Sequence, residues 1–144
     1  MDAQELIEAT TRTWNERDKD GYLALYTDDC EMTVPGFSGR GHEGLGQFWD
    51  VEMTALPDNK VTVLRTAVGD GGALVVEESV IEGTNTGPLV GADGSELPPT
   101  GKHVSAPFAM VHEVRDGKLA ASRCYYDQLE FLAQLGVTAD AALA

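Results

Sequence analysis

From Lys60 onward the sequence consists of segments that have the spacing and composition of β-strands. The run KVTVLRTAV alternates, ALVVEESVIEG is rich in valine and isoleucine, and HVSAPFAMVHEV and KLAASRCYYD follow with similar patterns. The turn sequences GDGG and RDGK join these runs in pairs, and Asp-Gly between two strand-like runs is a strong hairpin signal. We therefore expect about four antiparallel strands in this part of the chain.

The residues before Lys60 have mainly helical spacing. Apolar side chains recur on one face over residues 2–17, over a short segment around Tyr22, and over residues 42–55, and a last helix is predicted after Asp127. Between them, CEMTVPG has the pattern of a short strand and GFSGRGHEG that of a glycine-rich loop. Helices, then strands, then a closing helix predict an α+β fold in which helices cover one face of a curved antiparallel sheet.

Two segments have no helical or strand pattern. Residues 84–102, TNTGPLVGADGSELPPTGK, are polar and rich in glycine and proline, which predicts a long loop between two strands. Loops of this length in compact domains are often functional or mobile, so a role as a lid is open. The tail VTADAALA is expected to be frayed.

Length and composition limit the kinds of protein that this chain can be. Its 144 residues, 42% of them hydrophobic, predict one domain over residues 1–144 with a packed core. A formal net charge of −14 disfavours nucleic acid and anionic membranes as partners. The acidic N-terminus lacks the pattern of a secretion signal, and no apolar run approaches the roughly 20 residues of a membrane span, so we expect a cytoplasmic protein.

The hairpin at Asp116-Gly117 predicts which side chains share a face of the sheet. A two-residue turn pairs Arg115 with Lys118, and the pairs then step outward along both strands. One face is then expected to carry Ala106, Phe108, Met110, His112, Arg123, Tyr125 and Asp127. Apolar walls with a few polar groups are typical of a ligand pocket.

The candidate catalytic residues on this face are Asp127, Tyr125 and Arg123. A carboxylate in an apolar pocket has a raised pKa, which suits Asp127 for proton transfer. Tyr125 would donate a hydrogen bond to a substrate oxygen, and Arg123 would stabilise developing negative charge. The alternative is structural, because Asp127-x-x-Glu130 also matches a helix capping box.

The remaining candidates for the pocket wall are Phe108, Met110, Ala106, Trp14, Trp49 and His42. One of Glu77 and Glu78, which point to opposite faces of their strand, is a further candidate. His103 and His112 are expected to face solvent. No histidine pair has metal-ligand spacing, and the two cysteines, Cys30 and Cys124, form no CxxC motif, so we expect no metal.

Several motifs together resemble the SnoaL-like polyketide cyclases of the nuclear transport factor two-like superfamily. They are RDKDGYLALYTDDCEM, GRGHEGLGQFW, LPDNKVTV, GTNTGPL, PPTGKHV and VRDGKLAASRCYYDQLEFLAQLG, which span roughly residues 3–137. The Gly-Thr-x-Thr-Gly loop and the ending before Gly136 are fairly specific when they occur together. The chain differs from our expectation for the cyclases at Arg123 and Tyr125, where an aromatic residue and a small amide would stand.

The resemblance implies a cone-shaped α+β barrel around a deep pocket, frequent homodimers through the outer sheet face, and no cofactor. It also implies an enzyme in which the aspartate before the last helix, here Asp127, is the general acid/base of an intramolecular aldol closure. The expected ligand is a small hydrophobic molecule with a carbonyl group. Related isomerase or dehydratase activity, a non-catalytic binding protein, and an epoxide hydrolase with an Asp-Arg-Asp set remain alternatives, because the fold alone does not choose among them.

Overall fold

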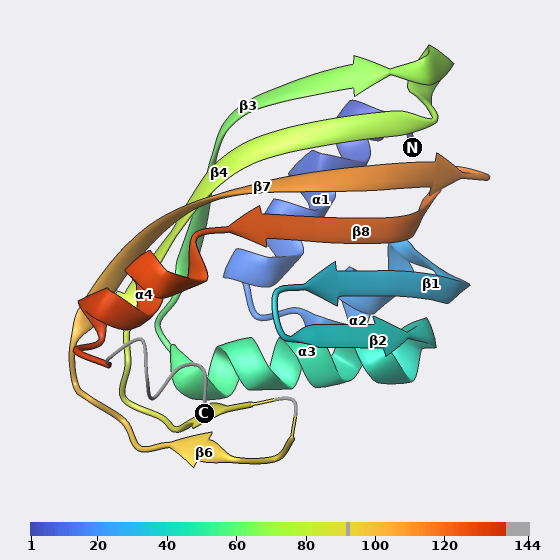
Figure 1. Ribbon diagram of the computed structural model, residues 1–144. Coiled ribbons are helices and arrows are strands. Elements are labelled where there is room, and N and C mark those ends of the chain that lie inside the picture. The colour runs from blue at the N-terminus through green and yellow to red at the C-terminus, as the bar shows by residue number, and fades with distance from the viewer. Residues whose placement is uncertain (92, 138–144) are drawn as a thin grey trace.

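The computed structural model describes residues 1–91 and 93–137, and it shows helices packed against a curved sheet (Figure 1). The helices are α1 (Ala3–Asn15), α2 (Lys19–Ala24), α3 (Gly41–Ala55) and α4 (Gln128–Gln134), with a 3-10 turn at Asp70–Gly72. The strands are β1 (Tyr26–Val34), β2 (Phe37–Arg40), β3 (Lys60–Gly69), β4 (Leu74–Thr84), β5 (Leu89–Val90), β6 (Glu96–Leu97), β7 (His103–Arg115) and β8 (Lys118–Tyr126). The predicted α+β fold with a curved sheet is confirmed. The predicted frayed tail lies almost entirely outside the described residues.

Six strands form the main sheet in the order β2-β1-β8-β7-β4-β3. The expected strands β3, β4, β7 and β8 are all present and pair in antiparallel fashion. β1 joins them by a parallel pairing with β8, and β2, which was expected to be loop, pairs with β1. The sheet therefore has one parallel pair that the hairpin signals did not indicate. No helix of the described residues is long and apolar enough to cross a membrane.

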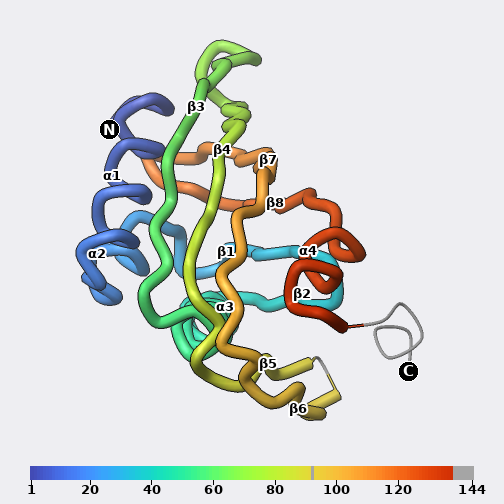
Figure 2. Tube along the Cα trace, turned by 90° about the vertical axis from the view of Figure 1, so that its left-hand side faces the viewer, coloured from blue at the N-terminus to red at the C-terminus, as the bar shows by residue number. Residues whose placement is uncertain are grey.

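Residues 84–102 are not structureless. They contain the short β5–β6 hairpin, which extends from the ends of β4 and β7 (Figure 2). Asn85 anchors the base of this segment: its Nδ2 donates to the carbonyl oxygen of Ala55 at 3.0 Å, and its Oδ1 accepts from the Thr100 amide at 2.8 Å. Asn85 is buried, so these bonds satisfy polar groups that water does not reach.

Two of the sequence motifs meet at the C-terminal end of α3. In LPDN, Asp58 Oδ1 accepts from the Thr84 amide at 2.7 Å, and Asn59 Oδ1 accepts from the Trp14 indole nitrogen at 2.7 Å. In GTNTG, Gly87 lies so close to α3 that a Cβ there would come within 1.8 Å of the Thr54 carbonyl oxygen. The motifs thus hold α1, α3 and β4 together around one point.

A cluster of aromatic side chains fills the space between α1, α2, α3 and β1. Trp14 packs edge-on against Trp49 and Tyr22, with ring centroids 4.9 and 5.5 Å apart, and Tyr26 lies 5.5 Å from Tyr22. All four rings are buried. Aromatic rings are large and rigid, so this cluster sets the spacing between the helices and the sheet.

The N-terminal part of α3 touches β2 through backbone atoms. A Cβ placed on Gly44 would lie 2.7 Å from the Gly39 carbonyl carbon, and a Cβ on Gly39 would lie 2.9 Å from the Gly44 carbonyl oxygen. No side chain fits at that distance without a shift of the backbone. Glycine at both positions therefore lets α3 lie directly against the strand.

We predict opposite effects for two glycine substitutions in α3. Gly44→Ala should lower the free energy of unfolding by roughly 1–3 kcal/mol, because the new methyl group forces helix and strand apart. Gly46→Ala should raise it by about 0.5–1 kcal/mol, because the nearest atom is the flexible end of Lys19 at 3.6 Å and alanine favours the helix. Chemical denaturation measures both, and equal effects of the two variants would contradict this packing.

Candidate active site

A cavity of about 750 Å³ lies between the inner face of the sheet and the helices. Its walls come from α1, α2 and α3, from strands β1, β2, β3, β4, β7 and β8, and from the β5–β6 hairpin and α4. Eight aromatic residues line it, namely Trp14, Tyr22, Tyr26, Phe37, Phe48, Phe108, Tyr126 and Phe131. The volume and the aromatic walls are those of a site for a small organic molecule.

The charged groups of this cavity are acidic. Glu52, Glu77 and Asp93 line it, and none of the described residues that line it is a lysine or an arginine. The cavity therefore favours ligands that are neutral or positively charged over anions.

The β7–β8 hairpin has the predicted turn but not the predicted register. Asp116 and Gly117 both have positive φ, 53° and 73°, and Arg115 pairs with Lys118 as expected. Val114 then pairs with Leu119, whereas Glu113 pairs with Ala121. β8 thus carries one extra residue at this bulge, and a slip of one residue moves every later side chain to the other face.

The predicted position of Arg123 and Tyr125 on the cavity face is therefore wrong. Ser122, Cys124 and Tyr126 lie opposite His112, Met110 and Phe108 instead. Arg123 donates from Nη1 to Glu113 Oε2 at 2.7 Å, and Tyr125 is 56% exposed. Neither lines the cavity.

Asp127 has the position of a helix cap. Its Oδ1 accepts a hydrogen bond from the Glu130 amide at 3.0 Å at the start of α4. It is exposed and does not line the cavity. The geometry supports the capping alternative. A catalytic role for Asp127 stays a prediction, and the structure shows no contact between Asp127 and the cavity.

The expected wall residues divide into two groups. Ala106, Phe108, Met110 and Trp14 line the cavity. Trp49 is buried in the aromatic cluster behind the wall, and Nε2 of His42 lies 3.0 Å from the Tyr26 carbonyl oxygen, outside the cavity lining. Trp49 and His42 therefore support the wall from behind.

Glu52 is the side chain that the sequence reasoning missed. It follows Phe48 by one helical turn, so the same face of α3 carries both into the cavity. Burial raises the pKa of Glu52 from its ordinary 4.5 to about 7, and no charge or hydrogen bond from the described residues offsets this. An acidic residue four positions after a predicted inward phenylalanine was the available signal.

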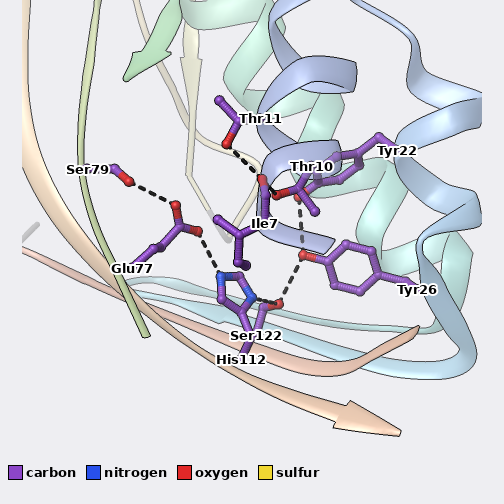
Figure 3. A network of polar contacts seen from close by, with 9 residues as sticks. All are labelled: Ile7, Thr10, Thr11, Tyr22, Tyr26, Glu77, Ser79, His112 and Ser122. Carbon is purple, nitrogen blue, oxygen red and sulfur yellow. Dashed lines mark hydrogen bonds and ion pairs between the residues drawn. The ribbon is translucent and has the colours of Figure 1, made fainter. Parts of the chain in front are cut away.

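A chain of polar side chains runs from the strands of the sheet to α2 (Figure 3). Nε2 of His112 is 2.8 Å from Glu77 Oε1, and its Nδ1 is 2.6 Å from Ser122 Oγ. The Tyr26 hydroxyl is 3.0 Å from Ser122 Oγ and 3.5 Å from the Tyr22 hydroxyl. We call these five residues the Glu77–Tyr22 chain.

His112 was expected to face solvent, and this is wrong. His112 is only 1% exposed, because α1 covers this end of the sheet. Ile7 of α1 packs against Val75, and Val75 is the cross-strand partner of His112.

Of the two adjacent glutamates, Glu77 is the one that faces the cavity. Burial raises the pKa of Tyr26 to about 12, so its hydroxyl keeps its proton at neutral pH.

Among the described residues, no group of three or more histidine, cysteine, aspartate or glutamate side chains is placed to hold a metal ion. Cys124 lines the cavity, but burial raises the pKa of its thiol to about 12, which keeps it protonated and poorly nucleophilic. Glu52 and the Glu77–Tyr22 chain are the candidate groups for chemistry that we consider next.

Comparison with known proteins agrees with this architecture. The sequence model of the SnoaL-like domain matches residues 7–122, which is more than half of the chain. The chain belongs to the SnoaL-like domain family. A comparison with curated proteins finds no match. The family supports an enzymatic role at a general level and does not specify the substrate.

Solved structures of similar fold cover nearly the whole SnoaL-like chain. IdmH from Streptomyces antibioticus, a proposed polyketide cyclase, is 26% identical, with a TM-score of 0.75 over 94% of this chain and 99% of that chain. AclR from Streptomyces galilaeus, a proposed hydroxylase, is 19% identical, with a TM-score of 0.77 over 93% and 95%. A protein of ketosteroid isomerase-like fold from Catenulispora acidiphila DSM 44928, solved with trimethylamine, is 19% identical, with a TM-score of 0.76 over 94% and 95%.

We predict that Glu52→Gln stabilises the protein at neutral and alkaline pH. A folded-state pKa near 7 means that ionising Glu52 costs free energy in the folded state, and this cost develops as the pH rises from about 4.5 to 7. Glutamine removes the cost, so the variant should gain about 2 kcal/mol at pH 8 and almost nothing at pH 4. Chemical denaturation at both pH values measures the difference.

The matched control is Glu43→Gln, which removes an exposed glutamate from the first turn of the same helix. That change should destabilise slightly, by roughly 0.5 kcal/mol, through the lost interaction with the helix dipole. A Glu52→Gln variant that behaves like Glu43→Gln at pH 8 would show that Glu52 is solvated.

Proposed function

We propose that this SnoaL-like protein is a cofactor-independent enzyme that moves a proton on a hydrophobic carbonyl compound, with Glu52 as the general acid/base. The observation that carries the proposal is a carboxylate that has no partner among the described residues, with its pKa raised to about 7, in an aromatic cavity of about 750 Å³. A general base works best when its pKa is close to the working pH. A neutral carbonyl compound also suits a cavity whose charged groups are acidic.

The chemistry is that of an aldol closure within one molecule. Glu52 takes a proton from the carbon next to a carbonyl group, and the electron pair of the C–H bond forms an enolate. The enolate carbon attacks a second carbonyl of the same molecule and forms a C–C bond. The new alkoxide then receives the proton from Glu52, so atoms and charge balance without a cofactor. The cavity contributes by excluding water and holding the two carbonyl groups together.

The related isomerase and dehydratase reactions use the same first step. Each begins with removal of a proton next to a carbonyl group, so each requires the same base. The epoxide hydrolase alternative has less support, because its Asp-Arg-Asp set needs an arginine in the cavity. Arg123 pairs with Glu113 instead, outside the cavity lining.

A binding protein without chemistry is the second candidate. An unpartnered carboxylate among aromatic rings also suits a hydrophobic amine, whose protonated nitrogen would pair with Glu52. The neighbour from Catenulispora acidiphila was solved with trimethylamine, which supports testing amines. A protein of this kind would bind its ligand and leave it unchanged.

We predict that the protein catalyses hydrogen–deuterium exchange next to the carbonyl group of 2-tetralone, a neutral bicyclic ketone. The rate should rise with pH through about 7, as Glu52 becomes ionised and able to accept a proton. Glu52→Gln should slow the exchange by about 100-fold or more, because glutamine is not a base. NMR in D₂O follows the loss of the ketone's proton signals.

Two variants complete the experiment. Glu43→Gln is the matched control and should keep the wild-type rate, because Glu43 is exposed and lies outside the cavity lining. Asp127→Asn should also keep it; loss of exchange in this variant, with Glu52→Gln active, would move the catalytic role to Asp127. Binding of a protonated amine, without any hydrogen–deuterium exchange in the ketone, would favour the binding protein without chemistry.

A further inference from the structure

We propose that Tyr126 is the residue that donates a hydrogen bond to the carbonyl oxygen of the substrate. Its hydroxyl group keeps its proton and stabilises the negative charge that develops on that oxygen when Glu52 removes a proton from the neighbouring carbon. The inference rests on the proposed function, because it assigns the oxygen-binding group of the same carbonyl site. It names a residue that the predicted register of the hairpin places on the opposite face of the sheet.

The bulge in β8 decides which of two adjacent tyrosines faces the cavity. Without the extra residue near Ala120, Phe108 would pair with Tyr125, whereas in the structure it pairs with Tyr126. Tyr126 therefore lines the cavity, and Tyr125 is 56% exposed. A tyrosine hydroxyl is thus present on the cavity face of β8, one residue later than the hairpin signal predicts.

Several other hydrogen-bond donors of the cavity wall are already bonded within the protein. Thr10 and Thr11 both donate to one backbone carbonyl oxygen of α1, at 2.8 and 3.0 Å. The indole nitrogen of Trp14 donates to Asn59 Oδ1 at 2.7 Å. A ligand oxygen that bonded to one of these groups would have to displace an internal partner, which cancels most of the gain.

The hydroxyl groups of the Glu77–Tyr22 chain bond to one another. Ser122 Oγ lies 2.6 Å from Nδ1 of His112 and 3.0 Å from the Tyr26 hydroxyl. The Tyr22 hydroxyl has a longer contact of 3.5 Å with the Tyr26 hydroxyl. Tyr22 is therefore the rival donor from which an experiment must distinguish Tyr126.

Tyr126 differs from these groups, because its hydroxyl makes no hydrogen bond to any of the described residues. Its oxygen is not enclosed by protein either: among the described side chains, the fully enclosed polar atom without a partner is Thr27 Oγ1. A hydroxyl that faces an aromatic cavity without a partner has lost hydrogen bonds that water would supply. A ligand oxygen in the cavity would restore such a bond.

Packing places Tyr126 toward the part of α3 that carries Glu52. The Tyr126 ring lies edge-on to Phe131, with ring centroids 6.0 Å apart. Phe131 packs against the apolar cluster that includes Ala55 and Leu56, about one helical turn after Glu52. The charge of Glu52 is also, after burial, the second cause that raises the pKa of Tyr126, which agrees with this placement.

A raised pKa suits a group that donates a hydrogen bond and keeps its proton. Burial raises the pKa of Tyr126 above its ordinary value of 10.0, so the phenol stays neutral and does not compete with Glu52 as the base. When Glu52 takes the proton, the C–H electron pair forms the enolate, and the hydrogen bond from Tyr126 strengthens as charge grows on the oxygen. The step yields a hydrogen-bonded enolate and a protonated Glu52, so atoms and charge balance.

The test uses carbonyl-¹³C-labelled 2-tetralone bound to the protein, and its C=O stretching frequency in the infrared. Hydrogen bonding to the oxygen lowers this frequency. Tyr126→Phe should therefore shift the frequency upward and slow the hydrogen–deuterium exchange by about 100-fold, the effect of removing one oxyanion donor. Phenylalanine keeps the ring that packs against Phe131, and ¹³C NMR of the label shows that the ketone still binds to the variant.

The matched control is Tyr125→Phe, which removes the hydroxyl of the adjacent, exposed tyrosine and should leave the frequency and the rate unchanged. An upward shift in Tyr125→Phe or Tyr22→Phe that exceeds the shift in Tyr126→Phe would overturn the assignment. Exchange that requires Glu52, with a rate and a frequency that are indifferent to Tyr126→Phe, would refute the inference and leave the proposed function standing.

Two further outcomes separate the inference from the proposed function. An upward shift in Tyr126→Phe, with no exchange catalysed by the wild-type protein, would support Tyr126 as the oxygen donor of a binding site and refute the proposed catalysis. A ketone that does not bind to the wild-type protein would contradict both.

Discussion

Backbone contacts at both ends of α3 determine where the Glu52 side chain is located. Near its start, Gly44 lies against Gly39 of β2 with no room for a side chain, and near its end Ala55 accepts a hydrogen bond from Asn85. A helix held at both ends cannot rotate, so the face that carries Glu52 is kept toward the cavity. Burial of a carboxylate without a partner costs free energy, so a motion that brought Glu52 to water would be favourable. The contacts at both ends of α3 oppose such a motion.

The cavity contains two glutamates in different environments. Glu77 is fully bonded to Ser79 and His112 and belongs to a chain that ends at a tyrosine hydroxyl, whereas Glu52 has no partner among the described residues. The raised pKa of Glu52, beside a chain of hydrogen-bonded hydroxyl groups, would allow one site to supply both a base and a source of hydrogen bonds. Aromatic residues line the same cavity, and apolar surroundings strengthen both kinds of interaction.

Much of this fold could be predicted from the sequence, because strands, turns and helices leave local patterns. The Asp116-Gly117 turn and the strands beside it were predicted correctly, and Phe108, Met110 and Ala106 line the cavity as expected. The extra residue of β8 near Ala120 leaves no such pattern, because a bulge depends on how two strands fit together. This extra residue moved the side chains that follow it in β8 to the opposite faces of the sheet. The site depends on contacts distant in sequence, which spacing alone does not show.

The measurement that tests the central claim most directly is a ¹³C NMR titration of the glutamate side-chain carboxyl groups, with Glu52→Gln to identify one signal. We predict that the Glu52 signal titrates with a midpoint near pH 7, well above the ordinary 4.5 of a solvated glutamate. This result would place an unpartnered acid/base group in the cavity at neutral pH. A Glu52 signal that titrates with the exposed glutamates would contradict the account, because a solvated carboxylate is not adapted for proton transfer.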